Sequence, residues 1–217
     1  MRALTAATFR RRARDLATRD PALGRVVASY GLPRFWERPA TFATLVLFII
    51  EQQVSLASAK ATFDRLGAAI GGITPQRLLG ANDDAFAVAG LSRQKRRYVL
   101  ALADAAVQGV VDLDALAGQP DAEARHTLLG LLGVGPWTAD VYLLSALRRP
   151  DVWPSGDRAL QVGVGEVLGL DGAPDVDQTD HIGERWRPSR SVAARLIWHS
   201  YLCRRGRTET IVAGLEP

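Results

Sequence analysis

Apolar residues recur along the chain at the three- and four-residue spacing of amphipathic α-helices. The clearest case follows Thr41, a candidate N-cap, because the next apolar residues share one face: Phe42, Leu45, Val46, Ile49 and Ile50. The same spacing, bounded by Gly, Pro and capping residues, predicts further helices over Leu4–Thr18, Pro21–Tyr30, Arg93–Gln108 and from Ser189 or Ser191 to about Arg205. No stretch alternates as a strand with a hairpin turn would, so the pattern predicts an all-α protein.

The stretch from Leu128 to Gln161 carries the most informative local pattern. Gly133-Val134-Gly135-Pro136 predicts a tight turn between two helices, because glycine allows unusual backbone angles and proline suits the first turn of a helix. Apolar positions then continue at helical spacing from Trp137 to Leu147. The N–H groups of such a turn, beside a helix N-terminus, suit an anion such as phosphate. An ordinary αα-hairpin is the alternative.

The same stretch resembles the helix-hairpin-helix (HhH-GPD) superfamily of DNA glycosylases. That family has the turn pattern G-h-G-x-x-T-A, matched by Gly133 to Ala139, and then an aspartate, matched by Asp157 twenty residues after Trp137. Residues 51–59 look like the family's first signature, and residues 186–193 with Trp198 look like its C-terminal one. The resemblance covers about residues 21–205 and is greatest to the 3-methyladenine DNA glycosylase II branch.

The fold that the resemblance implies is all-α and two-lobed, a helix-hairpin-helix DNA glycosylase fold with the active cleft between the lobes. We expect residues 1–40 to form N-terminal helices that pack with the C-terminal lobe, and residues 41–130 to form a central helical bundle. Residues 131–217 then hold the hairpin, the catalytic aspartate and the C-terminal helices. The implied partner is double-stranded DNA that contains damaged bases, and we expect a monomer.

Asp157 is the predicted catalytic residue. Breaking the bond between a base and its sugar leaves positive charge on the sugar, as in glycosidases. A carboxylate beside that charge stabilises it and can orient or deprotonate a water molecule. The alternative for an aspartate that follows Ser-Gly is a plain helix N-cap.

Position 137 bears on the mechanism. Bifunctional relatives carry a lysine there, which forms a Schiff base and then cuts the strand. This chain has Trp137, and its only lysines are Lys60 and Lys95, far away in sequence. We therefore expect a monofunctional glycosylase that uses water and leaves an abasic site.

The predicted base pocket is aromatic, because electron-rich rings attract the positive charge of N3- or N7-alkylated purines. Trp137 and Trp198 match positions that line the pocket in the resembled enzyme, and Tyr142 and Trp153 are weaker candidates. Tyr142 and Trp153 also suit the core or the wall of a cleft. Val141 stands where the resembled enzyme has a pocket tyrosine, so the preferred base stays open.

Contacts to DNA are predicted first at the hairpin. The hairpin residues concerned are Gly133, Val134, Gly135 and Thr138. On the other side of the turn, backbone carbonyls suit a K⁺ or Na⁺ ion that bridges to the same phosphate when DNA is bound. The carbonyls are those of Leu129, Leu131 and Val134. No other cofactor is expected.

Two further places are predicted to contact DNA. Gln53 aligns with the wedge that fills the space left by an extruded base, and Ser55 lies beside it. An amide is less usual there than an apolar side chain, so a surface or helix-contact role is the alternative. Arg93 and Lys95 open a basic helix, which suits phosphate contact or a solvated face equally.

Composition narrows the setting. The net charge of +4 fits nucleic acid without establishing it. The single Cys203 excludes an intramolecular disulfide and the four-cysteine iron–sulfur cluster of some superfamily members, and it fits a reducing compartment. The longest apolar run, Leu45–Ile50, is too short to span a bilayer. We expect a cytoplasmic, nucleoid-associated bacterial protein.

The predicted function is the hydrolysis of the N-glycosidic bond of alkylated purines, of the 3-methyladenine and 7-methylguanine type, in duplex DNA. An alternative in the same class is a glycosylase for another lesion, such as a deaminated or oxidised purine. Alternatives of another class are a non-catalytic DNA-structure-binding protein that uses the hairpin, and a helical interaction module.

Overall fold

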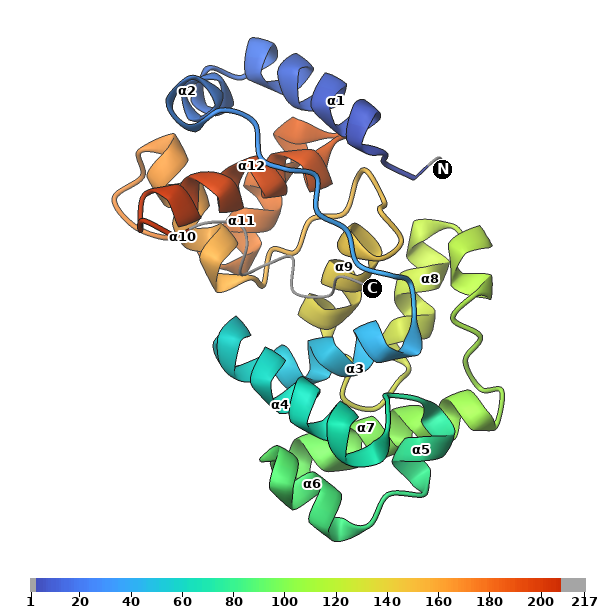
Figure 1. Ribbon diagram of the computed structural model, residues 1–217. Helices are drawn as coiled ribbons and strands as arrows, with labels where there is room; N and C mark the ends of the chain where they lie inside the picture. Colours follow the sequence, from blue (N-terminus) through green and yellow to red (C-terminus); the bar gives the residue numbers. More distant parts are fainter. Residues whose placement is uncertain (1–2, 208–217) are drawn as a thin grey trace. The chain divides into compact units, whose positions relative to one another are not determined.

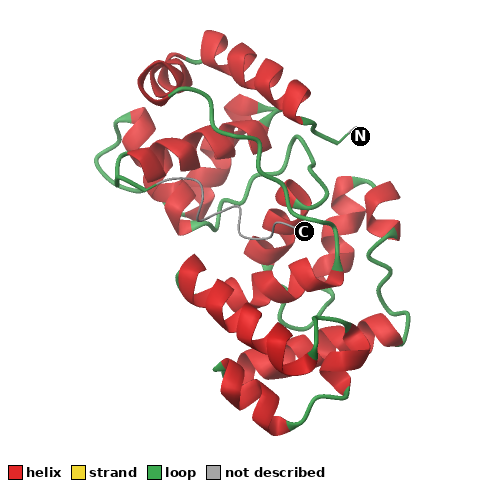
Figure 2. Cartoon of the chain, in the orientation of Figure 1, coloured by secondary structure: helices red, strands yellow, loops and turns green. Residues whose placement is uncertain are grey.

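The computed structural model describes residues 3–207. Within this range the chain forms twelve α-helices and two short 3₁₀ helices joined by turns and loops, with no strand (Figures 1 and 2). The prediction of an all-α protein is therefore confirmed. Each of the described helices is too short or too polar to cross a membrane.

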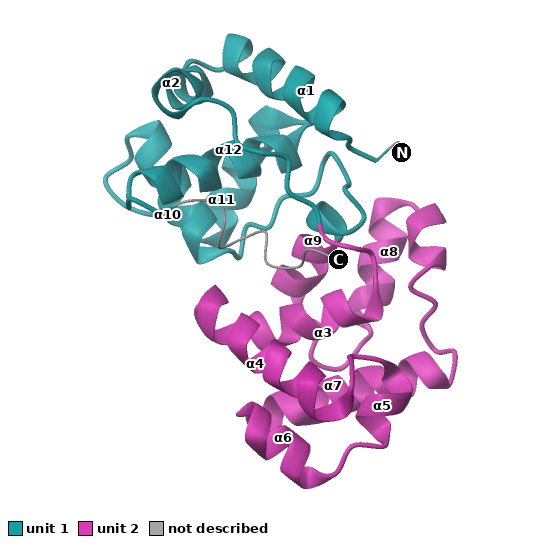
Figure 3. Cartoon of the chain, in the orientation of Figure 1, with its two compact units in different colours: residues 1–37, 143–213 teal, residues 38–142, 214–217 magenta. Residues whose placement is uncertain are grey.

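The chain divides into two compact units (Figure 3). Unit 1 contains the described residues up to Glu37 and those from Leu143 onwards, and unit 2 contains Arg38–Tyr142. The second boundary falls inside one helix, α9 (Pro136–Ser145). The hairpin therefore belongs to the unit that holds the central bundle, whereas the sequence analysis grouped it with the C-terminal helices.

Unit 2 is built around α3 (Phe42–Glu51), which packs against α4 and α7. Every residue of α3 from Leu45 to Ile50 is at most 2% exposed, so this helix is buried on all sides rather than on one face. The remaining helices of the unit are α4 (Leu56–Ile70), α5 (Pro75–Leu79), α6 (Asp83–Ala89), α7 (Arg93–Val107), η1 (Ala115–Gly118) and α8 (Asp121–Leu129), followed by the first part of α9.

Local capping sets where these helices begin. The side chains of Thr41, Asn82 and Ser92 each accept a hydrogen bond from a backbone N–H in the first turn of the following helix. Left-handed glycines, Gly71 and Gly90, end α4 and α6. The starts of α3 and α7 are the ones that the sequence pattern predicts.

Unit 1 surrounds α12 (Arg190–Cys203), the orange-red helix in Figure 1. This helix packs against three others, α1 (Ala6–Arg19), α2 (Pro21–Tyr30) and α10 (Arg158–Leu168), and α11 (Val176–Gly183) and η2 (Glu184–Trp186) complete the unit. Gly163 lets α10 approach α12 closely, since a Cβ there would lie 2.6 Å from Ile197 Cγ2. Asp20 caps α2 and also accepts the indole N–H of Trp186 at 2.8 Å.

Candidate nucleic-acid interface and active site

The turn between α8 and α9 contains Gly133 and Gly135. The fold requires glycine at position 133, whereas the space around Gly135 would admit a side chain. Gly133 has a φ of 88°, and a Cβ there would lie 2.6 Å from the Cβ and 2.7 Å from the Cδ2 of Tyr98. Val134 is buried and donates its N–H to the Leu131 carbonyl at 3.0 Å. Gly135 is exposed, and a Cβ there would meet no atom within 4 Å. The backbone at Gly135 therefore stands open at the N-terminus of α9.

Two sets of polar contacts hold this hairpin in shape. Arg125 on α8 binds Asp140 on α9 through two bonds, Nε to Oδ1 at 2.6 Å and NH2 to Oδ2 at 3.1 Å. The Nε2 of Gln52 donates to the Gly133 carbonyl at 2.8 Å and to Thr138 Oγ1 at 3.0 Å. The hairpin thus has an ion pair across its two helices and an amide bridge at its turn.

Thr138 supports the turn from inside. The sequence predicts it as a DNA contact, but the residue is only 1% exposed, and its hydroxyl accepts the Gln52 amide. Its side chain therefore lies on a buried face of α9, in contact with the residue that ends α3. The side chain of Thr138 is therefore not accessible for the predicted contact to DNA and supports the turn instead.

The three carbonyls predicted for a monovalent cation belong to the same hairpin. The Leu131 carbonyl accepts the Val134 N–H, which leaves it a second lone pair. Within residues 3–207, no group of three His, Cys, Asp or Glu side chains could hold a metal ion. The oxygen atoms that this turn could present to a hard cation are therefore backbone carbonyls, namely those of Leu129, Leu131 and Val134.

The loop between α3 and α4 carries the predicted wedge. Gln53 is exposed and has a φ of 59°, a left-handed conformation that costs a non-glycine residue about 1 kcal/mol or more. Val54 beside it is 44% exposed. Ser55 is exposed, but its hydroxyl accepts the Ser58 N–H at 3.2 Å and so caps α4. The loop therefore projects Gln53 outward from a strained backbone.

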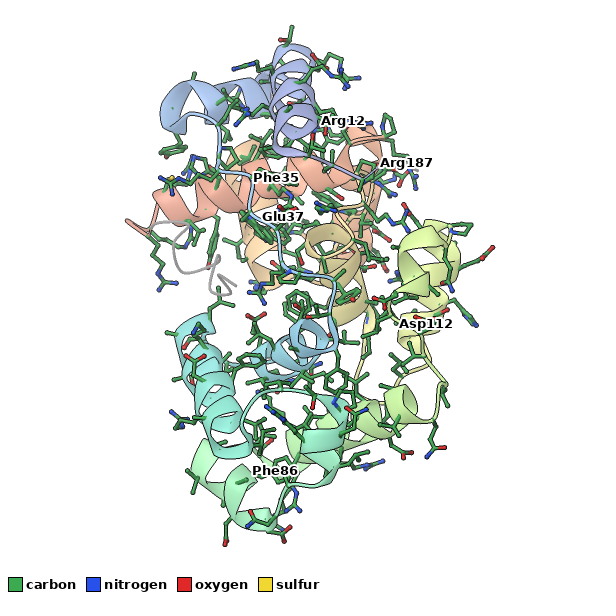
Figure 4. All side chains as sticks on the ribbon, turned by 45° about the vertical axis from the view of Figure 1, so that its right-hand side comes forward. Arg12, Phe35, Glu37, Phe86, Asp112 and Arg187 are labelled. Carbon is green, nitrogen blue, oxygen red and sulfur yellow. The ribbon has the colours of Figure 1, made fainter. Side chains whose placement is uncertain are left out.

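The two basic residues predicted to contact DNA at the start of α7, Arg93 and Lys95, differ in their surroundings. Lys95 donates from Nζ to the Ile50 carbonyl at 2.7 Å, and burial lowers the pKa of its ammonium group. It therefore stabilises the C-terminal end of α3 instead of reaching into solvent. Arg93 is exposed, which fits a phosphate contact and a solvated face equally. The neighbouring Arg96 forms an ion pair with Asp83, and its guanidinium stacks on the ring of Phe86, which Figure 4 labels.

Aromatic side chains of unit 2 meet beside the hairpin. Trp137 is half-buried and lies edge-on to Phe48, with ring centroids 6.4 Å apart. Tyr142 packs on Phe48 in the same way but is fully buried, and its hydroxyl finds no partner within the described range. Burial, and then the charge of Asp114, raise the pKa of Tyr142. Of the two predicted pocket residues in unit 2, Trp137 and Tyr142, only Trp137 is partly exposed.

Asp157 lies in unit 1 at the N-terminus of α10. Its Oδ1 accepts two hydrogen bonds, from the Leu160 N–H at 2.7 Å and from the Trp198 indole N–H at 3.0 Å. The carboxylate is therefore a helix N-cap that an aromatic side chain also orients. Trp198 is half-buried and packs beside Trp36, with ring centroids 6.0 Å apart, so the ring that bonds to this carboxylate is itself held by a second aromatic ring.

A buried arginine holds the aromatic side of this arrangement in place. Arg195 is 1% exposed, and its guanidinium lies 4.2 Å from the Trp36 ring centroid and 5.1 Å from that of Phe35, which Figure 4 labels. It donates to the carbonyls of Trp36 and Leu144, each at 2.9 Å. The connector that carries Phe35 and Trp36 is thereby fixed to α12.

Trp153 lies in the core of unit 1. It is 5% exposed, its ring packs on Trp186 with centroids 5.2 Å apart, and its indole N–H donates to the Thr179 carbonyl at 2.9 Å. Gly183 lies so close that a Cβ there would be 2.5 Å from Trp153 Nε1. Because its ring packs in the core and its N–H is hydrogen-bonded there, Trp153 is not accessible to a base, and its prediction as a pocket residue is wrong.

Residues 46–188 match the family described as HhH-GPD superfamily base excision DNA repair protein. The match spans the Gln53 loop, the hairpin and Asp157. The chain belongs to the HhH-GPD superfamily. The resemblance seen in the sequence is therefore confirmed.

Known relatives agree with this membership. DNA-3-methyladenine glycosylase 2 of Escherichia coli is 30% identical over 127 residues, which are 58% of this chain and 42% of that protein. The DNA-3-methyladenine glycosidase structure from Bacillus halodurans has a TM-score of 0.75 at 26% identity and covers 98% of both chains. The Schizosaccharomyces pombe 3-methyladenine DNA glycosylase Mag1, in complex with abasic DNA, has the same fold, with a TM-score of 0.78 at 23% identity over 87% of this chain and 95% of that one. The chain spans 38%, 59% and 37% of the length of three further curated relatives.

Several residues that shape this HhH-GPD site escape sequence reasoning. Tyr98 backs the Gly133 turn, Gln52 bridges to it, and the Arg125–Asp140 pair closes it, yet each lies in a different element from its partner. One signal was present in the sequence, since Asp140 is the only charged residue in the mostly apolar stretch from Trp137 to Leu147. A buried acid in an apolar helix requires a cationic partner.

Proposed function

We propose that this HhH-GPD protein is a DNA glycosylase of base excision repair that hydrolyses the N-glycosidic bond of alkylated purines in duplex DNA. The observation that carries the proposal is Asp157, whose Oδ1 accepts hydrogen bonds from the Leu160 N–H and from the indole of the half-buried Trp198. Relatives named as 3-methyladenine glycosylases support the substrate class.

Asp157 is assigned the chemistry of bond cleavage. As the base leaves, positive charge develops on the sugar, and a carboxylate held by fixed donors stabilises it without reorienting at the moment of reaction. The same carboxylate can orient or deprotonate the attacking water. The N-cap bond and the catalytic role are compatible, because the first determines where the second carboxylate oxygen points.

Hydrolysis without strand cleavage is the proposed outcome. A lyase step needs an amine that forms a Schiff base with the sugar, and Trp137 provides none. The amine of Lys60 pairs with Asp64 at 2.7 Å, and that of Lys95 donates to the Ile50 carbonyl at 2.7 Å. If strand cleavage were observed, Lys95 would be the first amine to replace, since burial lowers its pKa.

Aromatic stacking is the proposed basis of substrate choice. Of the predicted pocket residues, Trp137 in unit 2 and Trp198 in unit 1 are half-buried rather than buried, and a cationic alkylated purine gains cation–π energy from an accessible aromatic ring. Alkylation also weakens the glycosidic bond, so a permissive pocket suffices for selectivity.

DNA is proposed to bind through unit 2. Gly135 and the N-terminus of α9 would bind backbone phosphate, with K⁺ or Na⁺ held by the hairpin carbonyls, and Arg93 would add a second phosphate contact. Gln53 would fill the gap that the extruded base leaves in the stack.

The test is base release from methylated duplex DNA by wild type and by Asp157→Asn. Asparagine is as good an N-cap as aspartate, so the variant keeps the fold but loses the charge. We expect free 3-methyladenine or 7-methylguanine from wild type, with strands intact until alkali treatment, and release about 10²- to 10⁴-fold slower from the variant. Asp175→Asn is the matched control, because Asp175 caps α11 through the Gln178 N–H at 2.8 Å.

Unchanged release by Asp157→Asn would refute the catalytic assignment. Absence of release by wild type from methylated, deaminated and oxidised duplexes alike would refute the enzymatic proposal. Tight binding to those duplexes in the same experiment would instead identify a DNA-structure-binding protein that uses the hairpin.

A further inference from the structure

One amide joins two functional segments that lie far apart in the sequence. Gln52 ends α3, and its Nε2 reaches the Gly133 carbonyl, 81 residues away, and the Thr138 hydroxyl, 86 residues away. A side-chain amide nitrogen has two hydrogens, and both donate to acceptors in the hairpin. The contact is between side chain and turn, and it involves no charge.

The chain on the N-terminal side of Gln52 is held firmly. Glu51 forms a buried ion pair with Arg38 at 2.8 Å, and both side chains are 5% exposed. One residue earlier, the Ile50 carbonyl accepts the Lys95 ammonium group at 2.7 Å. The end of α3 is thereby tied to the connector before it and to α7.

The chain on the C-terminal side is strained and exposed. Gln53 has a φ of 59°, which an L-residue with a side chain rarely adopts unless its surroundings impose it. The Val54 N–H makes a long bond, 3.4 Å, back to the Glu51 carbonyl. Gln52 is therefore the last well-anchored residue before the loop, and its amide connects that anchor to the hairpin.

We propose that Gln52 is a positioning residue that couples the Gln53 loop to the hairpin. Through it, binding of phosphate at the hairpin fixes the loop in the strained conformation that presents Gln53 to the base stack. The inference rests on the proposed function, because it assigns Gln53 the wedge role and the hairpin the phosphate role. Gln52 itself touches neither DNA nor the reacting atoms in this assignment.

The decisive variant is Gln52→Leu, which keeps a side chain of similar bulk, one atom shorter, and removes both hydrogen bonds. At saturating enzyme, we expect the single-turnover rate of base release to fall about 10- to 100-fold, since small misplacements of a positioned group have effects of this size. The enzyme concentration at half-saturation should change less than about threefold, because the hairpin phosphate contacts remain. Gln76→Leu, an exposed glutamine on α5, is the matched control and should match wild type.

Partner variants separate positioning from general damage. Thr138→Ser keeps the hydroxyl and should retain the wild-type rate, whereas Thr138→Val removes one of the two acceptors and should lose part of it. Gln53→Ala should slow release in the same way, and the double variant with Gln52→Leu should be no slower than the slower single variant, because both act at one step. Multiplying effects in the double variant would overturn the proposal, as would an unchanged rate in Gln52→Leu.

Amide hydrogen exchange of the DNA-free protein tests the coupling independently of catalysis. In Gln52→Leu, exchange should rise together in residues 52–56 and 131–138 and stay unchanged in α5 and α6. If wild type released no base, the proposed function would fail, and this measurement would still decide the coupling. A rise in only one segment, or in neither, would refute it.

Discussion

The two glycines of the hairpin should respond in opposite ways to the same substitution. At Gly133, an added methyl group meets the Tyr98 side chain at 2.6 and 2.7 Å, and the backbone must keep a φ of 88°. A left-handed conformation costs a residue with a Cβ about 1–2 kcal/mol, and forced overpacking costs about 1–3 kcal/mol. We therefore expect Gly133→Ala to lower the free energy of unfolding by about 2–5 kcal/mol.

Gly135→Ala provides the matched comparison two residues away. Its Cβ would meet no atom within 4 Å, and its φ lies outside the positive region, so we expect its stability to stay within about 0.5 kcal/mol of wild type. Affinity for duplex DNA should nevertheless fall about tenfold or more, because the methyl group occupies the approach of the proposed phosphate and disturbs a charge-assisted bond.

Urea unfolding followed by circular dichroism measures both effects, and thermal unfolding gives a second readout. For a chain of this length, about 1 kcal/mol corresponds to roughly 2–4 °C in Tm, so Gly133→Ala should melt roughly 4–20 °C below wild type. Adding Tyr98→Ala removes the ring but leaves its Cβ, and the two changes should be less than additive by about 0.5–3 kcal/mol. Strict additivity, or equal stability of the two glycine variants, would refute the reasoning.

Two further predictions concern the buried polar groups. Trp198→Phe keeps the ring but removes the donor to Asp157 Oδ1, so base release should slow by about 10- to 100-fold with little loss of stability; Trp36→Phe is the control, and equal slowing by both would contradict the orienting role. Burial raises the pKa of Glu51 above 4.5 against the opposing effect of Arg38, so the folded state holds that proton more tightly than the unfolded chain. The resulting stabilisation is present below pH 4.5 and is lost as pH rises through the raised pKa, so the unfolding free energy of wild type relative to Glu51→Gln should fall from pH 4.5 upwards. If the difference in unfolding free energy between wild type and Glu51→Gln stayed constant or rose with pH, the raised pKa of Glu51 would be contradicted.

Local features of the sequence predicted the fold class and most helix boundaries. Thr41 caps α3, Ser92 caps the predicted helix that begins at Arg93, and Asp157 caps α10. These features are predictable because a cap bonds to the backbone two or three residues away, and the apolar spacing of a helix is set by its own geometry.

The burial of several predicted site residues could not be predicted from the sequence. Trp153, Tyr142, Thr138 and Lys95 each suit a ligand contact by type and position, yet all four turn inward or bond within their unit. Trp153 depends on Gly183 and Trp186 closing over it, and these lie some thirty residues further along the chain. No local pattern reveals which element packs over a given side chain.

The sequence by itself determined the helical architecture, the hairpin turn and the family, because each rests on residues within one short stretch. The tertiary structure alone decided which glycine of the turn is required, through Tyr98, and how the Gln53 loop is joined to the hairpin, through Gln52. It also placed the Trp198 donor on Asp157, from 41 residues away. Hydrogen bonds and close contacts of this kind form only once folding brings distant segments together, and their partners follow from packing rather than from any spacing along the chain.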